Sequence, residues 1–152
     1  MAATRRGSDG VALVLVSGGR FKRGSDRMGI KRGLAVCRQT YSHPEDCSGS
    51  WFDRETPQRE IELGAFYIDR YEVTNARYAG CVKAGRCGAI DYSRCNVYDP
   101  STGAWSTGGA GYPALKGPKN PVVCVTWQQA QQYCQWAGRD LPTDSIAELV
   151  AR

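Results

Sequence analysis

Seven cysteines in 152 residues constrain this chain more than any other feature of its sequence. An odd number leaves a free thiol, a cysteine that pairs with another chain, or a partner in a missing stretch of the same chain. There is no C-x-x-C pair, and His43 is the only histidine, which argues against a zinc finger or zinc ribbon. Cys37 and Cys47 bracket a loop, as a disulfide staple does. We therefore predict that six of the seven cysteines form structural disulfides.

Structural disulfides indicate an oxidising compartment. The N-terminus nevertheless lacks a convincing signal peptide, because the apolar run Val11–Val16 is short and no A-x-A-like cleavage site follows it. Either the true start lies upstream or the thiols stay reduced, and we favour the first alternative. We expect an extracytoplasmic protein, periplasmic or secreted. No apolar run approaches the roughly 18 residues that a membrane-spanning helix needs, so we expect no membrane span.

The net charge of +5 is distributed unevenly along the chain. Residues 1–38 contain nine Lys and Arg against two Asp, a net charge of +7, and the remainder has a net charge of −2. A nucleic-acid-binding surface needs clustered basic groups with aromatic stacking partners, and Phe21 beside Lys22 and Arg23 is little support for one. We interpret the basic segment as a solvated tail and loop, and we predict no nucleic-acid partner.

The pattern of elements predicts an α+β domain with high irregular content. Residues 1–12 are polar and glycine-containing and are predicted to be a disordered leader, and 13–152 are assigned to the domain. Strands are expected at 13–16, breaking at a glycine turn, at 59–63, at 66–68 and in the buried run 122–125. Two long loops, 22–58 and 86–121, are expected to carry function or to be stapled.

Three helices have clear start signals. Thr74 is expected to cap a helix over 75–84 that Gly85 ends. Thr126 and Gln129 form a capping box for a helix through Ala137, with Gly138 as its C-terminal cap. The inner face of that helix is assigned to Trp127, Ala130, Tyr133, Cys134 and Ala137. Thr143 caps a third helix.

These residues assemble no catalytic constellation by themselves. A Ser/His/Asp triad would need His43, and no G-x-S-x-G elbow occurs. Asp69, Glu72, Asp91, Asp99 and Asp144 have no EF-hand spacing and are interpreted as surface carboxylates. Residue types alone therefore indicate no activity.

Three motifs in a fixed order are more specific. Residues 15–21 are LVSGGRF, residues 66–75 are FYIDRYEVTN, and PVVCVTW at 121–127 is followed by YC, WAGR and LPT. This ordered set resembles the formylglycine-generating enzyme family, the sulfatase-modifying factor domain. We interpret the motif residues as architecture rather than catalysis; they are Gly18, Gly19, Phe66, Asp69, Glu72, Thr74, Trp127, Tyr133, Trp136, Gly138, Leu141, Pro142 and Thr143.

The resemblance implies a C-type-lectin-like fold, truncated to its N-terminal half. It also implies the family's activity, which is oxidation of a sulfatase cysteine to Cα-formylglycine with oxygen and copper(I). The reactive cysteine pair and the calcium ligands lie in the later half of the family's domain. We therefore assign no catalytic, cofactor-binding or metal-binding residue here and expect this chain alone to be inactive. Copper and calcium are expected only in a complete active member.

Two further expectations come from the resemblance. Cys81, Cys87, Cys95 and Cys124 resemble cysteines of exported bacterial members, so with Cys37 and Cys47 they are the disulfide candidates, and their connectivity stays open. Cys134 is expected to be an unpaired thiol, because its usual family partner would stand at Ala151. The partner is either a sulfatase-like polypeptide substrate or a protein ligand. The alternative function is a non-catalytic lectin-like binding module of an exported or kinase-associated bacterial protein.

Overall fold

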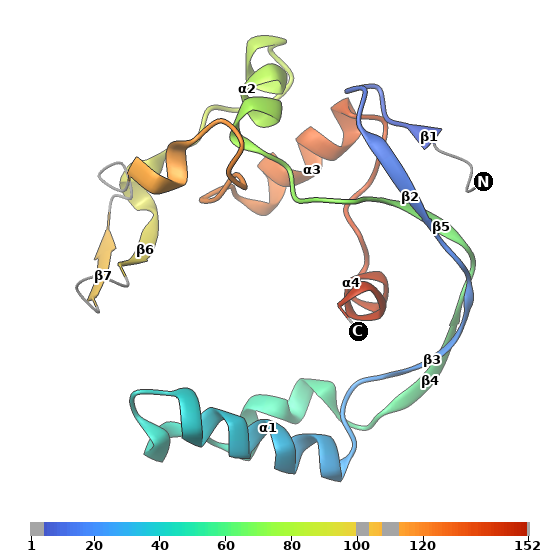
Figure 1. Ribbon diagram of the computed structural model, residues 1–152, viewed down its shortest axis with the longest axis vertical. Helices are drawn as coiled ribbons and strands as arrows, with labels where there is room; N and C mark the ends of the chain where they lie inside the picture. The colour runs from blue at the N-terminus through green and yellow to red at the C-terminus, as the bar shows by residue number, and fades with distance from the viewer. Residues whose placement is uncertain (1–4, 100–103, 108–112, 152) are drawn as a thin grey trace. The chain divides into compact units, whose positions relative to one another are not determined.

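The computed structural model describes residues 5–99, 104–107 and 113–151, and the chain divides into two compact units. The first comprises Met1–Val16 and Tyr67–Leu141, and the second comprises Ser17–Phe66 and Pro142–Arg152. Short sheets and helices make up both units, as labelled in Figure 1. The predicted α+β class is confirmed. Among the described residues, no helix is both long and apolar enough to cross a membrane.

A three-stranded sheet in the order β1-β2-β5 belongs mainly to the first unit. Its strands are β1 (Arg5–Arg6), β2 (Ala12–Val16) and β5 (Phe66–Asp69), and β1 pairs antiparallel with β2 so that Arg5 lies opposite Leu13. A turn closed by the Gly7 N–H donating to the Val11 carbonyl, 3.0 Å, joins β1 to β2. The prediction of a disordered leader is therefore wrong for residues 5–12, and residues 1–4 lie outside the described part.

Helices α2 (Asn75–Lys83) and α3 (Trp127–Trp136) begin and end where the sequence signals stand. Thr74 caps α2, and both bonds of the Thr126–Gln129 capping box are present. At the end of α3, Gly138 has φ +70° and donates to the Gln135 carbonyl, while Arg139 donates to the Cys134 carbonyl. These two bonds make a Schellman motif, which confirms the predicted glycine cap.

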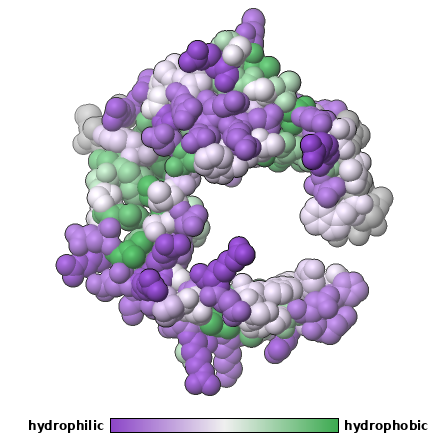
Figure 2. Space-filling model, turned by 180° about the vertical axis from the view of Figure 1, so that it is seen from behind, coloured by the Kyte–Doolittle hydropathy of each residue, from purple (hydrophilic) through white to green (hydrophobic). Residues whose placement is uncertain are grey.

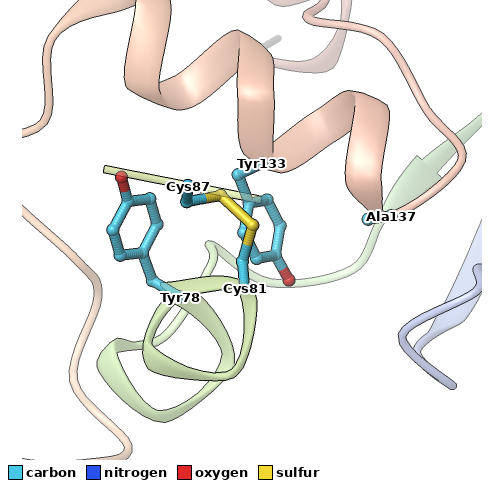
Figure 3. Close-up of a cluster of buried hydrophobic side chains, with 5 residues drawn as sticks. All are labelled: Tyr78, Cys81, Cys87, Tyr133 and Ala137. Atoms are coloured by element: carbon cyan, nitrogen blue, oxygen red, sulfur yellow. A yellow bond between two sulfur atoms is a disulfide. The ribbon is translucent and has the colours of Figure 1, made fainter. Parts of the chain in front are cut away.

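The core of the first unit lies between α2 and α3 (Figure 3). Tyr78 and Tyr133 stack with ring centroids 5.9 Å apart, and the Cys81–Cys87 disulfide and Ala137 are buried beside them. Trp136 packs against this core. Trp127, in contrast, is 65% exposed, so the prediction that it belongs to the inner face of α3 is wrong. Trp127 is not among the described residues that pack against this core.

The stretch predicted as irregular at 86–121 contains more structure than expected. It has 3-10 helices η3 (Tyr92–Arg94) and η5 (Pro113–Lys116) and the antiparallel pair β6 (Asn96–Asp99) and β7 (Ala104–Thr107). Conversely, residues 122–125 do not form the expected strand. Cys124 has φ +66°, a left-handed conformation that interrupts an extended run, and only the isolated bridge Thr74–Pro121 remains nearby.

In the second unit, β3 (Gly19–Arg23) pairs antiparallel with β4 (Arg59–Leu63), with Phe21 opposite Ile61. Helix α4 (Asp144–Val150), capped by Thr143 as predicted, contacts β3. The Gly24 N–H donates to Glu148 Oε1 at 2.8 Å, which ties the end of β3 to α4.

The prediction of a loop over residues 22–58 is wrong. This stretch contains helix α1 (Arg27–Thr40) and the 3-10 helices η1 (Pro44–Asp46) and η2 (Gly49–Glu55). Asp26 caps α1 by accepting from the Gly29 N–H at 2.7 Å. Gly29 and Gly33 weaken the helical signal in the sequence. In the fold, Gly33 lets the Phe52 ring approach the helix, since a Cβ there would lie 2.8 Å from the ring.

Three disulfides link the six candidate cysteines. They join Cys37 to Cys47, Cys81 to Cys87, and Cys95 to Cys124, and Cys134 carries a free thiol. Of the three connectivities left open by the sequence, the structure has the one that pairs Cys81 with its near neighbour. The Cys95–Cys124 bond spans 29 residues and therefore constrains much of the irregular stretch.

Candidate functional site

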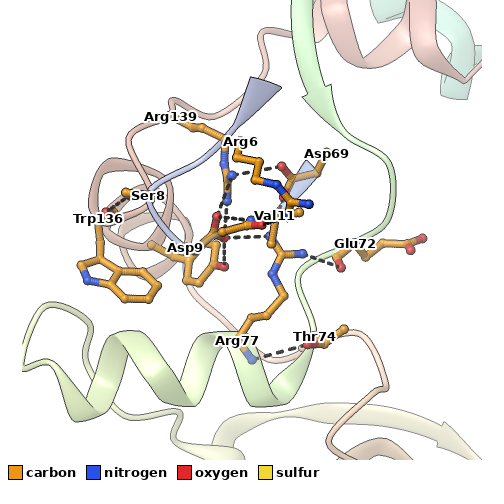
Figure 4. Close-up of polar contacts among 12 residues, drawn as sticks. Arg6, Ser8, Asp9, Val11, Asp69, Glu72, Thr74, Arg77, Trp136 and Arg139 are labelled. Atoms are coloured by element: carbon orange, nitrogen blue, oxygen red, sulfur yellow. Dashed lines mark hydrogen bonds and ion pairs between the residues drawn. The ribbon is translucent and has the colours of Figure 1, made fainter. Parts of the chain in front are cut away.

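A balanced cluster of charged side chains lies in the first unit (Figure 4). We call it the Asp9 cluster; its members are Asp9, Asp69, Arg77, Tyr133 and Arg139. Asp9 Oδ2 accepts from Arg139 Nη2 at 2.6 Å, from Arg77 Nη2 at 2.9 Å and from the Tyr133 hydroxyl at 2.9 Å. Asp69 Oδ2 accepts from Arg77 Nη2 at 2.8 Å, and Asp69 Oδ1 lies 3.3 Å from Arg139 Nη1. Two carboxylates thus alternate with two guanidinium groups.

Local structure explains how distant residues meet in this cluster. Asp69 ends β5, and Arg77 lies in the first turn of α2, where the Thr74 hydroxyl accepts its N–H. Tyr133 projects from α3, and the Schellman motif at Gly138 turns Arg139 back toward the turn between β1 and β2. Asp9 stands in that turn, 130 residues before Arg139. The cluster therefore fastens the N-terminal hairpin to β5, α2 and α3.

Burial makes the charges of this cluster interdependent. The Asp9 side chain is 4% exposed, and those of Arg139 and Arg77 are 13% and 20% exposed. Burial opposes ionisation of Asp9, but the hydrogen bonds from Arg139, Arg77 and Tyr133 outweigh it and hold the pKa of that carboxyl well below its usual range. Burial, with the hydrogen bond to Asp9, raises the pKa of Tyr133 to about 12. An ionised acid saturated with donors is not a general base, so we interpret the cluster as structural.

A small apolar pocket of about 230 Å³ adjoins the core, and Cys134 lines it. Tyr78, Val122, Val125, Tyr133 and Leu141 form much of the remaining wall, and Glu72 lies at it as well. Burial raises the pKa of the Cys134 thiol. The nucleophilic form of cysteine is the thiolate, so this thiol is poorly reactive near neutral pH.

A larger pocket of about 700 Å³ lies beside the Cys95–Cys124 disulfide. Its wall is mixed, with Asp91, Arg94 and Gln129 as polar members. One oxygen of the Asp91 carboxylate, Oδ1, accepts from the Ser93 hydroxyl and N–H, at 2.5 Å and 3.0 Å. Among the described residues that line this pocket there is neither a free thiol nor a histidine.

The described residues do not fit the metals that the family resemblance implies. Within residues 5–99, 104–107 and 113–151, no three His, Cys, Asp or Glu side chains come together in a way that could hold an ion. Copper(I) prefers soft thiolate ligands, and Cys134 is a single, half-buried thiol. Chemistry at copper or calcium therefore cannot be assigned to these residues.

Most predicted motif residues hold the framework. Thr74 and Thr143 cap helices, Gly138 ends α3, Tyr133 and Trp136 belong to the core region, and Asp69 joins the Asp9 cluster. Gly18 lies against the backbone of residues 63–65, whereas Gly19 has open space around its α-carbon. Phe66 is half-buried in β5, Leu141 is half-buried, and Glu72, Trp127 and Pro142 are exposed.

Sequence reasoning missed three members of the cluster and one further residue. Asp9 lies in a segment that composition marks as disordered, so no local signal marks it. Arg77 and Arg139 resemble ordinary surface arginines, although each lies next to a helix cap that fixes its direction. Asn75 at the end of the FYIDRYEVTN motif donates to the carbonyls of Leu115 and Gly117, at 2.6 Å and 3.0 Å, and so holds the irregular stretch.

The fold and the cluster define a small, disulfide-linked α+β domain in which several motif residues cap helices or pack in the core. The chain matches the model of the sulfatase-modifying factor enzyme 1-like domain over residues 2–152, and it belongs to this family. It is 34% identical over 125 residues to the formylglycine-generating enzyme of Streptomyces coelicolor. The aligned stretch covers 66% of this chain and 40% of that protein.

Two other relatives are named as an inactive enzyme and as a protein kinase. The chain is 27% identical over 166 residues to the inactive C-alpha-formylglycine-generating enzyme 2 of Mus musculus, covering 93% of this chain and 47% of that protein. It is 28% identical over 99 residues to the serine/threonine-protein kinase pkn1 of Chlamydia pneumoniae, covering 64% of this chain and 16% of that protein. The chain therefore spans less than half the length of each of these relatives.

Proposed function

We propose that this chain is the framework part of a formylglycine-generating domain with a C-type-lectin-like fold. A protein that carries the whole domain would oxidise a cysteine of a sulfatase polypeptide to Cα-formylglycine. The observation that carries this proposal is the family match over residues 2–152, together with 34% identity to a formylglycine-generating enzyme.

Within that function, the described residues hold the strands and helices of the domain in place and take no part in the reaction. The Asp9 cluster fixes the N-terminal hairpin against β5, α2 and α3, and the stacked Tyr78 and Tyr133 fix α2 against α3. Burial raises the pKa of the half-buried Cys134 thiol, and among the described residues no three His, Cys, Asp or Glu side chains come together in a way that could hold a metal ion. Copper and calcium would be held by the part of the domain that corresponds to the remaining length of the relatives.

The test compares two proteins on one substrate. The first is the whole protein encoded by the natural reading frame, and the second is the 152-residue chain alone. Each is incubated with copper(I), oxygen and a peptide containing C-x-P-x-R, and the peptide is analysed by mass spectrometry. We expect formylglycine with the whole protein and none with the chain alone. Product formed by the chain alone would contradict the assignment of a framework role.

A non-catalytic binding module is the second candidate. It is favoured by the similarity to a protein named as inactive, which extends over 93% of this chain. Under this alternative, the whole protein would be folded and would bind a polypeptide yet form no formylglycine on the same peptide. The mass-spectrometric assay above therefore decides between the two functions.

We also propose an extracytoplasmic location, periplasmic or secreted. Three disulfides support it, because such bonds persist in oxidising compartments and are rare in the cytosol. Fractionation of the source cells would locate the protein. Recovery of the protein from the cytosolic fraction with seven free thiols would contradict this proposal.

A further inference from the structure

The three disulfides of the chain differ in how far they are buried. Cys81 and Cys87 are 0% and 8% exposed and lie in the core of the first unit, and Cys47 is 6% exposed. Cys95 and Cys124 are both half-buried, so theirs is the disulfide in which neither cysteine is fully buried. Figure 2 shows that hydrophilic residues predominate on the face it presents, with apolar residues in smaller patches between them. Small water-soluble thiols can approach such a surface, so the burial of each disulfide decides which one they reach.

The Cys95–Cys124 disulfide also lines the larger pocket of about 700 Å³. Both of its cysteines belong to the wall of that pocket, and their neighbours Asn96 and Val125 lie in the wall beside them. A pocket of this size holds a drug-sized molecule, so it is large enough to admit a small dithiol. The pocket therefore gives a reductant a route to this disulfide.

The backbone at Cys124 has an unfavourable conformation. Its φ is +66°, in the left-handed region that residues other than glycine rarely adopt. Contacts on both sides hold it there, because the Val122 N–H donates to the Val73 carbonyl at 2.8 Å and Thr126 caps α3. The disulfide is a further, covalent constraint at the same residue, and opening it removes that constraint. Exposed or strained disulfides are the labile ones, whereas buried structural disulfides resist reduction.

The disulfide lies within a segment that is anchored at both ends. Before the segment, the Tyr78 hydroxyl donates to the Gly88 carbonyl at 2.9 Å. After it, Asn75 donates to the carbonyls of Leu115 and Gly117. Between these anchors, β6 and β7 pair only as a two-stranded ribbon in the described residues. A ribbon of two strands is marginally stable in water by itself, so it depends on its ties to the rest of the unit.

The stronger of two ties on this ribbon is the disulfide. The Cys95–Cys124 bond joins the start of β6 to the residues just before α3, and Lys116 Nζ lies 5.6 Å from the centroid of the Tyr92 ring. A single cation–π contact at an exposed site is weak, whereas the disulfide is covalent. Opening the disulfide should therefore loosen the ribbon and leave its two anchors in place.

We propose that the Cys95–Cys124 disulfide is a redox switch. A water-soluble dithiol reduces it ahead of the other two disulfides, and its reduction loosens residues 91–107 and with them one wall of the larger pocket. One thiolate of the dithiol attacks a sulfur of the bond and forms a mixed disulfide, while the other cysteine leaves as a thiol. The second thiol of the reductant then releases the remaining cysteine. The chain gains two electrons and two protons as two thiols, and the dithiol is oxidised to a disulfide.

This switch is independent of the proposed function, because it acts on the pocket whichever function the whole domain has. In an oxidising compartment the bond is formed, and it opens where a reducing dithiol meets the protein. The Cys81–Cys87 bond in the core stays closed during this step, so the change is confined to the ribbon and the pocket wall.

Differential alkylation of the full chain tests the selectivity. The native protein is treated with increasing concentrations of dithiothreitol, the new thiols are blocked with N-ethylmaleimide, and the labelled peptides are identified by mass spectrometry. Chymotrypsin cleaves after Trp127 and so separates Cys124 from Cys134, whose thiol is free from the start. We expect the Cys95–Cys124 pair to be labelled at least about tenfold faster than either other pair. Equal rates for the three pairs, or earlier opening of another pair, would overturn the inference.

Hydrogen exchange measures the loosening. At the dithiothreitol concentration that opens only the Cys95–Cys124 bond, amide exchange in residues 91–99 and 104–107 should become at least about tenfold faster. Exchange in α2 and α3 should stay as it is in the oxidised protein. Unchanged exchange in the ribbon would show that the bond does not hold it, and the proposed switch would then be wrong.

Two matched variants separate this disulfide from the loss of any disulfide. The variant C95S/C124S should show the fast exchange of the reduced protein without dithiothreitol and should not change further when dithiothreitol is added. The control C37S/C47S loses a disulfide of the other unit and should keep wild-type exchange in residues 91–107 and the response to dithiothreitol. A response of the ribbon to mild reduction that persists in C95S/C124S would contradict the assignment. Labelling of the wild-type chain decides the selectivity even where a variant fails to fold.

Discussion

Arg139 Nη2 lies 2.6 Å from Asp9 Oδ2, and this contact joins the first turn of the chain to the end of helix α3. The same carboxylate also accepts from Arg77, so one aspartate of the N-terminal hairpin ties together the two helices that form the core. Removing it would leave two partly buried guanidinium groups with Asp69 as the only carboxylate in the cluster. Uncompensated buried charge is among the most destabilising changes in a folded domain.

Asp9→Asn is therefore expected to lower the free energy of unfolding by about 3 kcal/mol. Asn keeps the shape of the side chain but loses the charge that Arg77 and Arg139 face. The measurement is urea-induced unfolding followed by circular dichroism at pH 7. Asp53→Asn, at an exposed aspartate of η2, is the control and should change the free energy by less than about 0.5 kcal/mol. Equal effects of the two substitutions would show that the Asp9 cluster does not stabilise the fold.

The low pKa of Asp9 predicts how stability changes with pH. An aspartate with a folded-state pKa below its ordinary value of 3.8 stabilises the fold fully above that value, and the contribution is lost as pH falls further. The wild-type unfolding free energy should therefore decrease more steeply below pH 4 than that of Asp9→Asn. Urea unfolding at several pH values between 5 and 3 would measure both slopes. Parallel curves would mean that Asp9 is not held ionised by its partners.

Adjacent glycines at 18 and 19 should differ sharply in tolerance. A Cβ at Gly18 would lie 2.6 Å from both the Ala65 nitrogen and the Leu63 carbonyl oxygen, which are backbone atoms with little freedom to move. At Gly19 a Cβ meets nothing within 4 Å. We expect Gly18→Ala to cost about 2 kcal/mol, as overpacking does, and Gly19→Ala to be neutral or slightly stabilising. Thermal unfolding of both variants measures the contrast, and a tolerated Gly18→Ala would contradict the close approach.

Roles that depend on neighbouring residues in the sequence could be predicted, whereas contacts between residues far apart in the sequence could not. Thr74, Thr126, Gly138 and Thr143 mark helix ends through bonds to residues at most four positions away, so the sequence alone predicted their roles. Asp9 acts through residues that are 68 to 130 positions away, and no local pattern indicates such a contact. Helix α1 was missed because Gly29 and Gly33 lower helix propensity, whereas the Phe52 packing and the Cys37–Cys47 bond that stabilise it involve residues outside the helix.

A count of thiols tests the disulfide framework and the burial of Cys134 together. Under denaturing, non-reducing conditions, protein from an oxidising compartment should show one reactive thiol, and Cys134→Ser should show none. In the native state that thiol should react at least about tenfold more slowly at pH 8, because burial both shields the sulfur and raises its pKa. Ellman's reagent, followed over time in both states, gives the count and the rate. Three or more thiols would mean that at least one disulfide is absent, and equal rates would place Cys134 at an open surface instead of in the apolar pocket.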